Sequence, residues 1–92
     1  MKIEPVEKFF GTHRNGGLTD ISKPQIDKIL GFKANVIDDP DKVKYSWAFT
    51  VDGVKCAIWD YKGSYREKFY STFGPADVLK KVFGDYYHSE HR

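Results

Sequence analysis

The sequence predicts an α+β fold, a small single domain of residues 1–92 with a three-stranded antiparallel sheet and two to three short helices packed on it. Three observations support this prediction. Apolar residues alternate on both sides of Asp52-Gly53, a helix start is marked at Ser22, and a second helix start follows Gly74-Pro75. We therefore expect the sheet to be centred on a hairpin at residues 43–62.

The predicted hairpin has one apolar face with a period of two residues. This face carries Val43, Tyr45, Trp47, Phe49, Val51, Val54, Cys56 and Ile58. Asp52-Gly53 suits a two-residue type I′ turn, in which both central residues have positive φ. The pattern therefore places Trp47 in the middle of the core, and it places Asp60 opposite Tyr45.

A third strand is expected at residues 68–73. We assign Phe69, Ser71 and Phe73 to the core face because this register buries two phenylalanines, and Tyr70 then faces the other way. A shift of one residue would reverse every one of these assignments.

Two helices have clear boundary signals. Ser22 and Gln25 match a capping box, and Gly31 suits a left-handed C-terminal residue, so a helix is predicted at residues 23–30. A second helix is expected to begin at Pro75. Its buried stripe would contain Val78, Leu79, Val82 and Phe83.

The remaining segments have weaker patterns. Residues 5–10 favour a short helix, with a strand as the alternative, because the segment is too brief for periodicity to decide. Residues 12–20 contain a Gly-Gly pair and other turn formers, which predicts an irregular surface loop. We expect a connection at residues 33–42 and a frayed terminus at residues 85–92.

Composition limits the classes of protein that the chain fits. Fifteen basic and thirteen acidic residues give a net charge of +2, which is too small for a protein that coats nucleic acid without a defined site. A single cysteine, Cys56, excludes an internal disulfide and favours a reducing compartment. Because no window resembles a membrane span or a signal peptide, a cytoplasmic location is expected.

One candidate binding surface lies on the hairpin face turned away from the core. Cross-strand pairing sets Thr50 opposite Lys55, Ala48 opposite Ala57, Ser46 opposite Trp59 and Lys44 opposite Tyr61. The third strand would add Tyr70 and Lys68. The predicted binding residues are Trp59, Tyr61, Tyr70, Lys44, Lys55 and Lys68. Two alternatives stay open, because this face is either exposed to a partner or covered by the N-terminal segment.

Trp and Tyr with lysines fit two kinds of partner. They anchor protein interfaces, including homodimers, and they also stack nucleotides or single-stranded nucleic acids. The small net charge favours a non-enzymatic protein-binding or inhibitory module, such as mobile elements often encode. No catalytic, metal or cofactor motif is present. His13 and Asp60 are the two residues to inspect for catalysis, and an enzyme is not expected.

Overall fold

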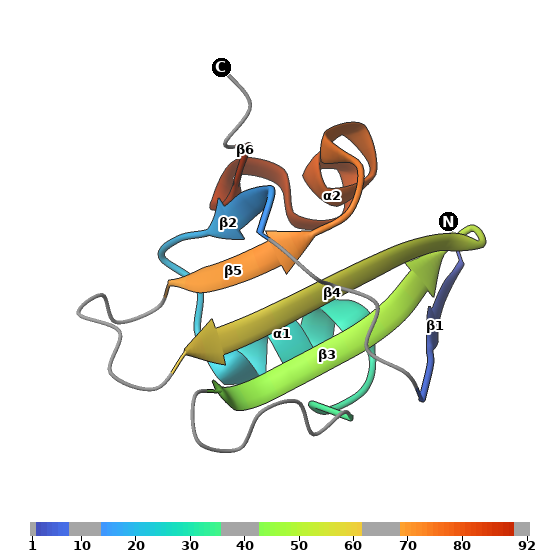
Figure 1. The fold of residues 1–92 in the computed structure, drawn as a ribbon, viewed down its shortest axis with the longest axis horizontal. Coiled ribbons are helices and arrows are strands. Elements are labelled where there is room, and N and C mark those ends of the chain that lie inside the picture. Colours follow the sequence, from blue (N-terminus) through green and yellow to red (C-terminus); the bar gives the residue numbers. More distant parts are fainter. Residues whose placement is uncertain (1, 8–13, 36–42, 62–68, 90–92) are drawn as a thin grey trace.

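The computed structural model describes residues 2–7, 14–35, 43–61 and 69–89. These residues form strands, two α-helices and one short 3₁₀ helix (Figure 1). In chain order the elements are β1 (Ile3–Pro5), β2 (Gly16–Leu18), α1 (Lys23–Leu30), β3 (Val43–Val51), β4 (Val54–Tyr61), β5 (Tyr70–Phe73), α2 (Ala76–Phe83), η1 (Gly84–Tyr86) and β6 (Tyr87–Ser89).

The strands form one antiparallel sheet of six strands in the order β1-β3-β4-β5-β2-β6. The prediction of a three-stranded sheet is therefore wrong, and the described part of the chain is mostly sheet with two α-helices. The three strands that the prediction lacks are β1, β2 and β6, each of three residues. Segments this short are too brief to show a period, and their pairing partners lie far away in the sequence.

The central hairpin is confirmed. β3 and β4 are joined by Asp52 and Gly53, whose φ angles of 51° and 82° are the positive values that a type I′ turn requires. The predicted pairs from Ser46–Trp59 to Thr50–Lys55 are present. A bulge between Val43 and Tyr45 sets Val43 opposite Tyr61, so the predicted pairing of Lys44 with Tyr61 is wrong.

The predicted register of the third strand is also wrong. Tyr70 faces the helices, and its ring meets Trp47 edge to face with the ring centroids 5.8 Å apart. Phe73 lies opposite Ala57 on the other face, where it packs against Trp59. Aromatic residues occur at both odd and even positions of this segment, so the alternation of side chains alone does not select the register.

β2 replaces the loop that was predicted around the two glycines. It lies between β5 and β6, and all three of its residues are buried. A Cβ on Gly16 would come within 2.7 Å of the Tyr87 hydroxyl, and one on Gly17 within 3.1 Å of the Phe69 ring. The two glycines therefore allow close packing inside the sheet, and they do not mark a turn.

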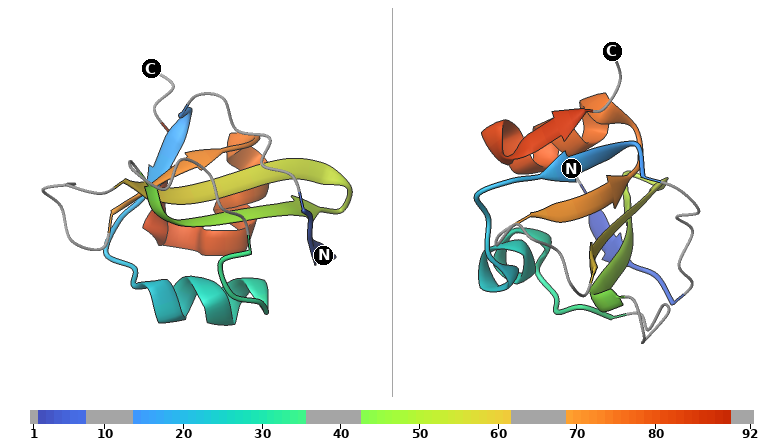
Figure 2. Two further views of the ribbon diagram at one scale, coloured as in Figure 1. Left: turned by 60° about the horizontal axis from the view of Figure 1, so that its bottom comes forward. Right: turned by 60° about the vertical axis from the view of Figure 1, so that its left-hand side comes forward.

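Both helices cover the same face of the sheet, as the left view of Figure 2 shows. α1 matches its predicted bounds, with the Ser22–Gln25 capping box present and Gly31 in the left-handed region. α2 begins one residue after Pro75, which is its N-cap. The main core joins the two helices to β3, β4 and β5. Its fully buried members include Trp47, Phe49, Ile58, Ile26 and Leu79.

The outer edge of β3 is covered along most of its length. Pro5 belongs to β1, so the strand alternative holds there and the predicted helix at residues 5–10 is wrong at its start. Beyond β1, the Asn35 side chain donates to the carbonyl oxygens of Val6 and Ala48 and accepts from the Ala48 N–H. An amide side chain thus continues the ladder where the strand ends, which protects an edge from further pairing.

Candidate functional site

The structure separates the residues that the sequence assigned to one binding surface. Trp59 lies on the predicted face but is only 3% exposed, together with the equally buried Ser46 and Ser71. Tyr70 is 6% exposed and lies on the opposite face, in the main core. Lys55 is exposed at the turn end of that predicted face. Among its described side chains the face is therefore buried around Trp59, and its exposed residue, Lys55, lies next to the Asp52-Gly53 turn.

Three predicted site residues have no described side chain. Lys44 and Tyr61 have a described backbone within the hairpin, and Lys68 lies outside the described residues. A binding role for these three residues stays a prediction. Residues 8–13, which the covering alternative invokes and which include His13, lie outside the described residues as well.

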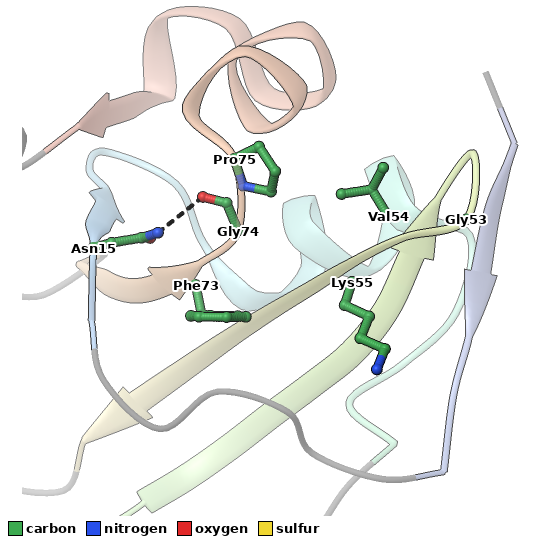
Figure 3. Close-up of a pocket in the computed structure, with 7 residues that line it drawn as sticks. All are labelled: Asn15, Gly53, Val54, Lys55, Phe73, Gly74 and Pro75. Atoms are coloured by element: carbon green, nitrogen blue, oxygen red, sulfur yellow. Dashed lines mark hydrogen bonds between the residues drawn. The ribbon is translucent and has the colours of Figure 1, made fainter.

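An open depression lies where the hairpin turn meets the end of β5. Its volume is about 610 Å³. Figure 3 shows the residues that line it, which come from three separate parts of the chain: Asn15, Gly53, Val54, Lys55, Phe73, Gly74 and Pro75. Phe73 and Val54 are half-buried, and Pro75 is exposed. The lining is therefore mainly apolar, with the Lys55 amine on one side.

The floor of this depression is held by close packing at Gly74. Its φ of +141° is a backbone conformation that suits glycine, and a Cβ there would come within 2.8 Å of the Cys56 sulfur. The Asn15 amide nitrogen donates to the Gly74 carbonyl oxygen over 3.0 Å, as drawn in Figure 3. These contacts fix the turn from β5 into α2 and set Phe73 and Pro75 on either side of Gly74.

A second depression of about 310 Å³ lies on the other side of Val54. It is lined by Val51, Asp52, Val54, Val78 and Lys81. Val54 lines both depressions, so they adjoin at the turn end of the hairpin. We call this region the hairpin-end surface and define it by Val54, Lys55, Phe73, Pro75, Val78 and Lys81.

The chemistry of the hairpin-end surface suits binding. Its side chains are two lysines, three apolar residues and a proline, a set that supplies no nucleophile paired with a base. Cys56 lies beneath Gly74, and burial raises the pKa of its thiol from 9.0 to about 11. A thiol with a raised pKa is mostly protonated at neutral pH, so it is a poor nucleophile.

A polar cluster around Asp27, on the core face of the sheet, has a structural role. The Trp47 indole N–H donates to Asp27 Oδ1 over 2.9 Å, and Lys23 Nζ pairs with Asp27 Oδ2 over 2.7 Å. The same ammonium lies 5.1 Å from the centroid of the Tyr45 ring. Asp60 lies opposite Tyr45, as predicted. A carboxylate beside an aromatic ring attracts a cation, and here the Lys23 ammonium lies between Asp27 and the Tyr45 ring.

Sequence reasoning identified Lys55 and missed the rest of the hairpin-end surface. Phe73 was assigned to the core because the predicted register was wrong, and Asn15, which lines the larger depression, was assigned to an irregular surface loop. Pro75 was interpreted as a helix start, and Val78 was assigned to the buried stripe of that helix. Half-buried Val54, directly after the type I′ turn, was the signal that could have located this surface.

No three His, Cys, Asp or Glu side chains among the described residues cluster in a way that could hold a metal ion. No helix in the same residues is long and apolar enough to cross a membrane. Comparison of the chain with protein-family models, curated proteins and solved structures found no match.

Proposed function

We propose that this chain is a small non-enzymatic binding module that engages a partner protein, or a second copy of itself, through the hairpin-end surface. One observation carries the proposal. Half-buried Phe73 and Val54 and exposed Pro75 surround an open depression of about 610 Å³. Apolar side chains gathered in a concave region are the usual centre of a protein interface or ligand site.

The geometry favours a protein partner over a nucleotide or a single-stranded nucleic acid. Base stacking requires aromatic rings with an open face. Trp59 and Tyr70, two of the rings that the sequence assigned to stacking, are 3% and 6% exposed. Phe73 is half-buried against Trp59. An aliphatic or aromatic side chain from a partner fits the depression between Phe73 and Val54 better than a base fits these covered rings.

Site-specific photocrosslinking tests the proposal. A photoreactive benzophenone amino acid placed at Val54 should give a covalent adduct with one partner species, or with a second copy of the chain. The same amino acid at Lys28, on the exposed side of α1, is the matched control and should give none. Excess unlabelled native protein should suppress the adduct, because it competes for the same partner.

A variant competitor tests whether the hairpin-end surface is the part of the chain that binds the partner. A Val54→Asp competitor places a charge in the apolar centre and should fail to suppress the adduct, while its thermal melting stays close to that of the native chain because Val54 is only half-buried. Adducts of equal yield at Val54 and Lys28 would contradict the proposal. So would equal suppression by the native and Val54→Asp competitors.

A further inference from the structure

The smaller depression, between the hairpin turn and α2, has an apolar lining of three valines. Val51 is buried, and Val54 and Val78 are half-buried. The volume of about 310 Å³ is at the lower end of the range for small-molecule sites. A branched aliphatic group that covered the exposed parts of Val54 and Val78 would remove apolar surface from water, which favours binding.

α2 contributes a positive charge to the same depression. Lys81 is exposed, and its ammonium forms no ion pair within the described residues. The neighbouring Lys80 differs, because its ammonium lies 3.7 Å from Asp85 Oδ1 and the residue does not line the depression. Lys81 is therefore available to a ligand carboxylate, with which it would form a charge-assisted hydrogen bond.

The hairpin turn contributes a negative charge through Asp52. Its Oδ1 accepts a hydrogen bond from the Lys2 backbone N–H over 2.7 Å, and the Asp52 N–H donates to the Lys2 carbonyl oxygen over 2.8 Å. These two bonds hold the turn against the N-terminal segment. Within the described residues the second oxygen, Oδ2, accepts no hydrogen bond, so it can accept one from a ligand ammonium.

We infer that the smaller depression binds a free α-amino acid with a branched aliphatic side chain, such as leucine. The side chain would lie against Val54 and Val78, with the carboxylate toward Lys81 and the ammonium toward Asp52. The flexible four-carbon side chain of lysine lets its ammonium follow a carboxylate that shares a carbon atom with the ligand's ammonium. This site requires only the smaller depression, so it goes beyond the proposed protein-binding role and does not depend on it.

NMR titration of the ¹⁵N-labelled protein with L-leucine and three analogues tests this inference. Leucinamide lacks the carboxylate, isocaproate lacks the ammonium, and glycine lacks the aliphatic side chain. L-leucine should shift the amide signals of Gly53, Val54 and Val78. It should bind roughly two to five times more tightly than leucinamide or isocaproate, since an exposed ion pair contributes modestly. Glycine should shift none of these signals.

Two variants test the role of each charge. Lys81→Gln should lower the affinity for L-leucine to that for leucinamide, while Lys80→Gln, the matched control on the same helix, should leave it unchanged. Asp52→Asn keeps a residue that suits a type I′ turn and should lower the affinity for L-leucine to that for isocaproate. The inference is overturned if L-leucine binds no more tightly than leucinamide and isocaproate, or if Lys80→Gln and Lys81→Gln have equal effects. Photocrosslinking at Val54 tests the protein-binding role separately.

Discussion

Replacing Asp27 should weaken the attachment of α1 to the sheet. The carboxylate receives the indole N–H of Trp47, which is fully buried, and the ammonium of Lys23 on its other oxygen. Asp27→Ala removes the acceptor and leaves a buried donor. A hydrogen bond to a charged group contributes about 1.5–3 kcal/mol, and a partly exposed ion pair adds at most about 1 kcal/mol.

We therefore expect Asp27→Ala to lower the free energy of unfolding by about 2–4 kcal/mol, out of roughly 5–15 for a domain of ordinary stability. The Asp27 and Lys23 side chains are 17% and 28% exposed, which keeps the ion-pair share small. Lys23→Met, which removes only the ion pair, should cost less than about 1 kcal/mol. Asp27→Asn keeps an acceptor for Trp47 and should fall between the two.

Urea unfolding followed by tryptophan fluorescence measures all three variants. The m-values should match that of the native chain, so that changes in midpoint report changes in stability. The reasoning would be refuted if Asp27→Ala and Lys23→Met cost the same amount. That result would mean that the hydrogen bond to Trp47 adds nothing beyond the surface ion pair.

Two further predictions concern the core. Burial, with smaller effects from Asp60 and other nearby groups, raises the pKa of the Tyr70 hydroxyl from 10.0 to about 12. Between these pH values the folded chain keeps a proton that the unfolded chain loses, so stability should fall by on the order of 2 kcal/mol as pH rises through this window. Tyr70→Phe should flatten that fall in alkaline urea melts, and an unchanged slope would contradict it. Gly16→Ala should cost about 1–3 kcal/mol through overpacking against Tyr87, and more than Gly17→Ala, whose nearest contact is longer; the reverse order in the melts would show that β2 accommodates the methyl group.

The elements that the sequence predicted correctly are those specified by neighbouring residues. Three such signals are present: the capping box at Ser22, the left-handed Gly31 and the Asp52-Gly53 turn. Each of them depends only on residues that are close to it in the sequence. Cross-strand pairing next to the turn follows from the turn itself, which fixes the register from Thr50–Lys55 outward. That certainty ends at the bulge after Val43, eight residues from the turn, where nothing in the local sequence marks an extra residue.

The elements that the sequence did not predict depend on distant partners. The glycines of β2 favour a turn when read locally, but β5 and β6 supply hydrogen bonds on both sides and side chains that leave no room for a Cβ. β6 was expected to be a frayed tail, yet it pairs with β2, about seventy residues earlier in the chain. Tertiary pairing of this kind overrides local preference, because the sheet satisfies backbone groups that a loop would leave to water.

The error in the register of β5 explains why the candidate site moved. With Phe73 assigned to the helix side, the sequence left Trp59, Tyr61 and Tyr70 as the aromatic residues of the other face. In the structure Phe73 occupies that face and packs against Trp59, while Tyr70 joins Trp47 in the core. Trp59 then supports Phe73 from behind, and Phe73 is the ring that reaches the depression beside Lys55. A Trp59→Ala change should therefore act on binding through the position of Phe73, and a loss of stability should accompany it.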